Sequence, residues 1–134
     1  PGMEYFNTYG GNPVSCAVGL AVLDVLEQEG LRRAAAATGE VLLNGFRELA
    51  QRSPVLGDVR GAGLYLGVEF VRDRDTREPA PGALAALLEA ARDDGLLLSS
   101  DGPEHNVLKI KPPLVFGEAE ARLLLAVVER HLGT

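Results

Sequence analysis

The spacing of the apolar residues changes near residue 60, and this change constrains the fold more than any other feature of the sequence. From about residue 14 to residue 49, apolar residues recur every three or four positions, as on one face of a helix. From Leu64 to Phe70 they fall on every second position, as on one face of a strand. Gly61-Ala62-Gly63 stands between the two patterns and predicts a tight turn. The chain therefore begins with helices and continues with strands.

Two consecutive helices are expected before the turn. Asn12-Pro13 is typical of a helix start, because Asn caps free amides and Pro is tolerated in the first turn. Gly30 predicts the end of this helix, and a second helix runs from there to Ser53-Pro54. The first helix is apolar on more than one face, which predicts burial on most sides. Its apolar residues are Val14, Ala17, Val18, Leu20, Ala21, Val22, Leu23, Val25 and Leu26.

The rest of the chain is expected to alternate between strands and helices. The expected elements are a strand at 56–60, its hairpin partner at 64–71, an exposed loop at 72–79, a helix from about 82 to 95, strands at 96–98 and 107–111, and a helix at 118–132. The order is ααββαββα. It predicts an α+β domain with a mostly antiparallel sheet of three or four strands, covered by helices on one side.

Composition narrows the class of protein. The chain has 134 residues and a net charge of −6, and its 13 Lys and Arg residues are scattered, which argues against nucleic acid as a partner. One cysteine allows no internal disulfide. No apolar run is long enough for a membrane helix and no signal segment is visible, so we expect a cytoplasmic protein. The opening, Pro1-Gly2-Met3, fits either a piece of a longer protein or a small protein with extra residues ahead of Met3.

The segment before the first helix has the outline of an anion site. Asn7 and Thr8 supply polar side chains, and Gly10 and Gly11 let the main chain approach a ligand at a helix N-terminus. The spacing matches neither the P-loop nor the dinucleotide fingerprint. A helix start with flexible residues explains the same pattern.

Lys109 and Lys111, the two lysines of the chain, form a second candidate site. Strand alternation places both on the face opposite Leu108 and Ile110, where they could bind a carboxylate or phosphate. Two solvated lysines near a sheet edge are the commoner interpretation of such a pair.

The remaining reactive side chains indicate neither a metal site nor a nucleophile. His105 and His131 lack a second ligand at metal-binding spacing. Cys16 is expected to face the interior of the protein, and Arg60 is expected to pin the turn beside it.

Three segments together resemble the class III aminotransferase family and occur in that family's order. They are residues 5–13 (YFNTYGGNP), 59–69 (VRGAGLYLGVE) and 106–114 (NVLKIKPPL). The resemblance covers nearly the whole chain and matches the C-terminal segment of pyridoxal-phosphate enzymes of fold type I. It implies that residues 1–134 are one C-terminal domain of a longer chain, with 1–30 as a linking segment and long helix and 31–134 as the small domain.

The resemblance also implies a division of labour between this segment and the rest of the enzyme. In the family, a lysine upstream of this segment holds pyridoxal phosphate as a Schiff base, and this chain has no candidate for it. The chain alone would then be inactive and contain no catalytic residue. Thr8, with Asn7, Gly10 and Gly11, would bind the cofactor phosphate of the neighbouring subunit, which implies a homodimer.

Lys109 departs from the pattern of many aminotransferases, which have an Arg there to clamp the substrate carboxylate. The segments around Thr8 and Lys109 are similar to the ethanolamine-phosphate phospho-lyase branch, whose members eliminate phosphate from an amino-alcohol phosphate. The residues are compatible with transamination or elimination of a small amino substrate. The alternative is a stand-alone, non-catalytic binding or dimerisation module with the same fold.

Overall fold

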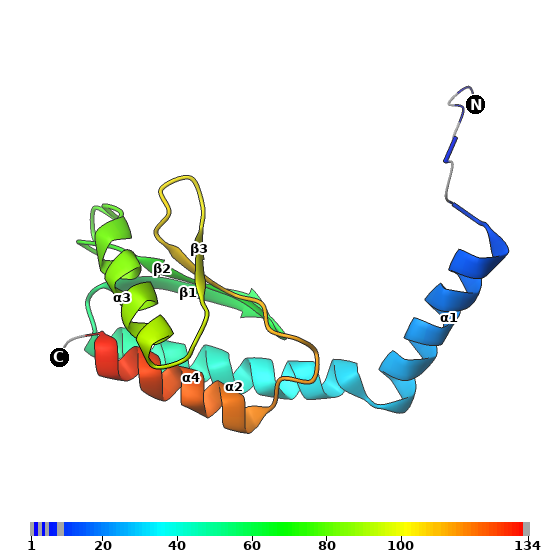
Figure 1. Ribbon diagram of the computed structural model, residues 1–134. Coiled ribbons are helices and arrows are strands. Elements are labelled where there is room, and N and C mark those ends of the chain that lie inside the picture. Colours follow the sequence, from blue (N-terminus) through cyan, green and yellow to red (C-terminus); the bar gives the residue numbers. More distant parts are fainter. Residues whose placement is uncertain (1, 3, 5, 8–9, 133–134) are drawn as a thin grey trace.

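The structure is a computed structural model and describes residues 2, 4, 6–7 and 10–132. Its elements are α1 (Pro13–Gln28), α2 (Leu31–Arg52), β1 (Leu56–Ala62), β2 (Tyr65–Phe70), α3 (Pro81–Asp93), β3 (Ser99–Asp101), β4 (Val107–Ile110) and α4 (Glu118–His131). The strands form one antiparallel sheet in the order β1-β2-β4-β3. Helices α2 and α3 pack against this sheet, and α4 packs against both helices (Figure 1). The predicted element order and α+β class are confirmed.

One hydrophobic core lies between the sheet and the helices. Leu66, Val68 and Phe70 of β2 point into it and are buried, because successive side chains of a strand alternate between its faces. From α2, Leu42 and Phe46 are fully buried against them. The other face of the strands is mostly polar and carries Arg60, Gly67 and Lys109.

The β1–β2 hairpin brings α2 very close to the sheet. Ala62 pairs with Tyr65, and Gly63 between them has a φ of +54°, which favours glycine. Helix α2 passes this turn at Gly39, where a Cβ atom would overlap the carbonyl oxygen of Gly63. At its other end β1 has a register irregularity between Leu56 and Val59.

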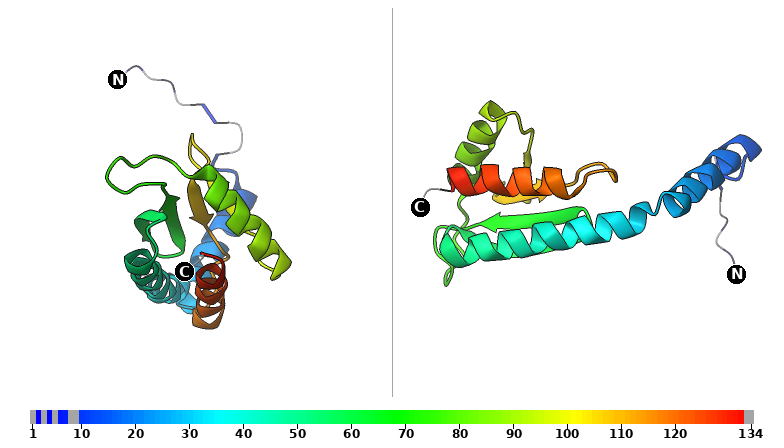
Figure 2. Two further views of the ribbon diagram at one scale, coloured as in Figure 1. Left: turned by 90° about the vertical axis from the view of Figure 1, so that its left-hand side faces the viewer. Right: turned by 90° about the horizontal axis from the view of Figure 1, so that it is seen from below.

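Helix α1 begins and ends as predicted, but its predicted burial is wrong. Asn12 Oδ1 accepts a hydrogen bond from the Ser15 amide at 2.9 Å, and Pro13 is the first helical residue. None of its residues is buried, and Val14 is 74% exposed. The helix extends away from the domain, as the right-hand view of Figure 2 shows, so the described part of the chain leaves its apolar surface uncovered. No helix among the described residues is long and apolar enough to cross a membrane.

The predicted position of the strand at Leu96 to Leu98 is also wrong. The strand in this region is β3, which begins directly after Leu98. The Leu96 amide donates a hydrogen bond to the carbonyl oxygen of Ala91 in α3 at 2.8 Å. Leu96 is therefore still bonded to the helix and does not pair with β4. Leu97 is 88% exposed. Pairing then starts at Ser99, which lies opposite Lys109.

Candidate active site

The uncovered face of the sheet carries a row of three aligned positions. Arg60 of β1 pairs with Gly67 of β2, and Gly67 pairs with Lys109 of β4. Since directly paired residues point to the same side, Arg60 and Lys109 flank a position without a side chain. The predicted placement of Lys109 opposite Leu108 and Ile110 is confirmed, because both of those residues are buried.

Lys109 is held by a carboxylate from the neighbouring edge strand. Its Nζ donates to Asp101 Oδ2 at 2.9 Å. This hydrogen bond raises the pKa of Lys109 and lowers the pKa of Asp101, whose other oxygen accepts from the Gly102 amide at 2.8 Å. Both groups are therefore charged near neutral pH.

Arg60 has acidic partners of its own. Its Nη1 lies 2.6 Å from Asp58 Oδ2 and 3.5 Å from Glu69 Oε2, and the hydrogen bond to Asp58 raises its pKa. Between Arg60 and Lys109 lies a hollow of about 470 Å³ above Gly67, also lined by Asp101. A Cβ atom on Gly67 would lie 3.2 Å from a methyl carbon of Val107, so even an alanine would crowd this floor.

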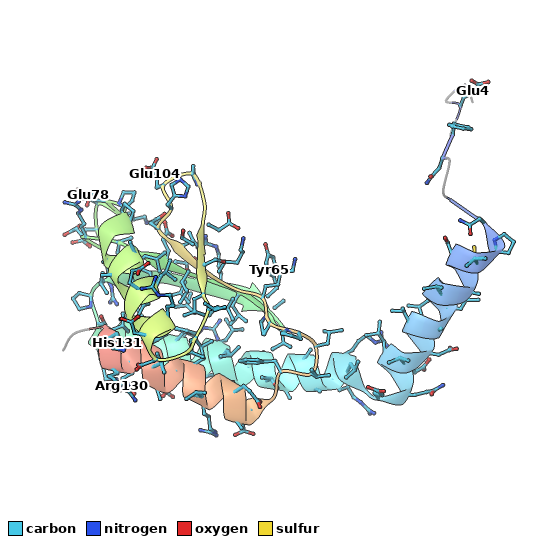
Figure 3. The ribbon with its side chains drawn as sticks, in the orientation of Figure 1. Glu4, Tyr65, Glu78, Glu104, Arg130 and His131 are labelled. Carbon is cyan, nitrogen blue, oxygen red and sulfur yellow. The ribbon has the colours of Figure 1, made fainter. Side chains whose placement is uncertain are left out.

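Lys111, the second predicted lysine, has a different environment. Its Nζ lies 5.8 Å from the centre of the Tyr65 ring, a cation–π arrangement. Tyr65 is 62% exposed and stands on the side of the sheet away from α2 (Figure 3). The two lysines thus share a face, but a carboxylate holds one and an aromatic ring accompanies the other.

The predicted cofactor-binding segment lies at the far end of α1. Asn7 Oδ1 accepts a hydrogen bond from the Gly10 amide at 3.0 Å, and Gly11 has a φ of +78°. A Cβ atom on Gly10 would lie 2.8 Å from the side-chain Nδ2 of Asn7, so a larger residue here would have to push the Asn7 side chain aside. Thr8 lies outside the described residues. Figure 1 shows this segment well separated from the sheet that carries Lys109.

The other reactive side chains that the structure describes gather into no further site. Among the described residues, no three His, Cys, Asp or Glu side chains gather as metal ligands. His131 Nε2 lies 2.8 Å from Asp94 Oδ2, and Arg130 reaches the same oxygen at 2.9 Å. Cys16 is exposed, which corrects the prediction that it faces the interior.

Two residues of the candidate site were missed from the sequence. Asp101 and Gly67 join Lys109 only through strand pairing, which depends on a register that spacing does not reveal. A usable signal was the Asp-Gly-Pro turn at 101–103, because it places a carboxylate at the end of the strand beside β4.

Comparisons with known proteins agree with this architecture. The profile of the family described as Aminotransferase class-III matches residues 2–132. The chain is 47% identical over 121 residues to an alanine–glyoxylate aminotransferase 2-like protein of Drosophila melanogaster, covering 90% of this chain and 24% of that protein. It is 47% identical over 115 residues to the ethanolamine-phosphate phospho-lyase homolog 1 of Caenorhabditis elegans, covering 85% and 25%.

A solved structure matches as well. It is a phospholyase from Arthrobacter in complex with phosphoethanolamine, 44% identical, with a TM-score of 0.84 over 96% of this chain and 30% of that one. The chain thus spans 24% to 30% of the length of these relatives.

Proposed function

This chain belongs to the class III aminotransferase family of pyridoxal-phosphate enzymes, and from that premise we propose that it is the C-terminal domain of an enzyme that eliminates phosphate from an amino-alcohol phosphate. Transfer of the amino group of a small amino substrate is the second candidate. Residues 1–30 form the linking segment and long helix of that domain, and residues 31–134 form its small domain.

The segment before α1 fits the phosphate of the cofactor. Gly10 and Gly11 expose main chain beside a helix N-terminus, and a Cβ atom on Gly11 would meet nothing within 4 Å. Asn7 fixes the Gly10 amide from one side. In the proposed enzyme these residues and Thr8 bind the cofactor phosphate of a second copy, which makes the enzyme a homodimer.

No residue of this chain fits the aldehyde of the cofactor. Both lysines lie on or just after β4, where Asp101 and Tyr65 accompany them. The lysine that holds the cofactor belongs to the large domain in our proposal, so this chain alone is inactive. Pyridoxal phosphate, when bound, supplies the electron sink for bond cleavage at the substrate.

The proposal depends on the position of Lys109. In the proposed enzyme Lys109 binds the anionic end of the substrate. It stands on the open face of the sheet, beside a hollow that also presents Arg60. A lysine is a compact charge without the planar fork that suits a carboxylate, so it accommodates a phosphate equally well. The similarity to the Caenorhabditis phospho-lyase homolog and to the Arthrobacter phospholyase supports elimination as the first candidate.

The test uses the full-length enzyme with pyridoxal phosphate and O-phosphoethanolamine. We expect release of inorganic phosphate without conversion of the cofactor to its amine form. Accumulation of the amine form, reversed by a keto acid and without phosphate release, would establish the transaminase instead. A Lys109→Ala variant should raise the KM for the phosphorylated substrate, whereas Lys111→Ala serves as the matched control on the same face.

The oligomeric state of the isolated chain in solution distinguishes this proposal from the alternative of a stand-alone module. The exposed apolar residues of α1, among them Val18, Leu20 and Leu23, predict that the isolated chain self-associates. An independent module should instead give a discrete monomer or dimer by light scattering. That result would favour the non-catalytic alternative.

A further inference from the structure

The ion pair between Asp101 and Lys109 joins a fixed group to a movable one. Asp101 Oδ1 is held by the amide of Gly102, whose φ of +83° belongs to the turn that ends β3. Its Oδ2 accepts from Lys109. Lys109 reaches that oxygen through a stem of four methylene groups, which has many rotamers. The lysine can therefore leave the pair while the carboxylate stays in place.

The same two side chains border the hollow above Gly67. Lys109 is 36% exposed and Asp101 is 56% exposed, so solvent and small solutes reach both. Arg60, on the opposite wall, already has Asp58 and Glu69 as partners. An anion that enters the hollow thus meets a lysine that is already paired with a carboxylate.

We propose that Asp101 is a resident competitor for Lys109, which an anionic group of the substrate, phosphate monoester or carboxylate, must displace before Lys109 can bind it. This inference rests on the proposed role of Lys109 in substrate binding. It makes Asp101 a specificity-determining residue, because it sets how strongly an anion must attract Lys109 to be bound. Weakly attracting solutes leave the pair intact.

The experiment measures anion binding to the full-length, cofactor-loaded enzyme with and without Asp101. Isothermal titration with inorganic phosphate and, separately, with acetate gives the Kd for each kind of anion, and steady-state kinetics with O-phosphoethanolamine separates KM from kcat. Asp101→Asn should lower the Kd for phosphate and the KM about two- to five-fold, the range that exposed ion pairs support. The kcat should not change. Asp101→Glu, which keeps the charge, should restore values near the wild type.

A double-mutant cycle shows whether the effect acts through Lys109. In a Lys109→Ala background, Asp101→Asn should no longer tighten anion binding. Asp93→Asn on α3 makes the same charge change away from the hollow and should leave the Kd unchanged. An equal gain from Asp93→Asn, or a gain that persists without Lys109, overturns the inference.

The failures of the two proposals are distinguishable. If Lys109→Ala weakens phosphate binding but Asp101→Asn leaves it unchanged or weakens it, the inference about Asp101 is wrong and the role of Lys109 stands. If Lys109→Ala leaves both the Kd and the KM unchanged, the proposed substrate contact is wrong, and the competition falls with it. Tightening for phosphate and acetate together supports displacement by anions in general, whereas tightening for phosphate alone restricts it to phosphates.

Discussion

Helices α1 and α2 follow each other in the chain and differ completely in how they are packed. Helix α1 has two charged residues among 16 and no buried side chain, whereas α2 has six charged residues among 22 and buries seven. The more apolar helix is thus the exposed one. Apolar composition indicates that a helix needs a partner, but it does not indicate whether that partner lies in the same domain. The following substitutions test how sharply the two helices differ.

The largest expected effect comes from the same truncation made in each helix. Leu42→Ala removes a fully buried side chain of α2 and should lower the free energy of unfolding by about 3 kcal/mol, through lost burial and the cavity left behind. Leu23→Ala in α1 should change it by less than about 0.5 kcal/mol, since Leu23 is exposed. Urea unfolding of both variants of the isolated chain, followed by circular dichroism at a dilution where light scattering shows a monomer, measures the difference. Equal losses would mean that α1 is packed in solution.

A second matched pair adds a methyl group instead of removing one. Gly39→Ala pushes a Cβ into the Gly63 carbonyl and should destabilise the domain by about 2 kcal/mol. Gly19→Ala in α1 meets nothing within 4 Å and should favour that helix by up to about 1 kcal/mol. In thermal unfolding, the melting temperature of Gly39→Ala should fall and that of Gly19→Ala should rise. A stable Gly39→Ala protein would show that α2 can shift away from the hairpin.

A smaller effect is expected where α2 ends and β1 begins. Arg74 donates to the carbonyl oxygens of Ala50, Ser53 and Leu56, so one side chain satisfies three main-chain groups at this junction. Arg74→Ala should lower the free energy of unfolding by about 1 to 2 kcal/mol, because these hydrogen bonds are charge-assisted. Arg72→Ala, which removes an exposed arginine of the same loop, is the control and should be near neutral.

The smallest effect depends on pH and concerns the contact between α3 and α4. The hydrogen bond from His131, and then the charge of Arg130, lower the pKa of Asp94 below its ordinary 3.8. The native state thus favours the ionised carboxylate, and the stabilisation is present above pH 3.8 and is lost as pH falls through the lowered value. Asp94→Asn should flatten the acid side of a plot of melting temperature against pH. Asp93→Asn next to it should leave that limb unchanged.

Much of the fold was predictable because its signals are local. The Asn12 cap, the glycine turn at 61–63 and the change of apolar period gave the right element order. The predictions that α1 is buried and that residues 96–98 form a strand were both wrong. Each property depends on which other segments lie beside the residues in the folded chain. The three leucines at 96–98 have the composition of a strand, but the Leu96 amide hydrogen-bonds to Ala91 of α3 instead of to a neighbouring strand.

The candidate site was predictable only in part, because only some of its signals are local in sequence. Strand alternation placed Lys109 on the open face, since alternation needs only the positions of its neighbours in sequence. The partnership with Asp101 depends on the register of β3 against β4 and could not be read from spacing. The binding role of Lys109 remains a prediction that the experiments above test. The cofactor-binding roles of Asn7, Thr8, Gly10 and Gly11 remain predictions.

The two edges of the sheet determine how this domain can meet other proteins. Edge strand β3 is three residues long and is followed by Gly102-Pro103, and edge strand β1 has its register irregularity between Leu56 and Val59. Short or irregular edge strands discourage the pairing of a further strand. We therefore expect copies brought together by the apolar surface of α1 to associate through side chains.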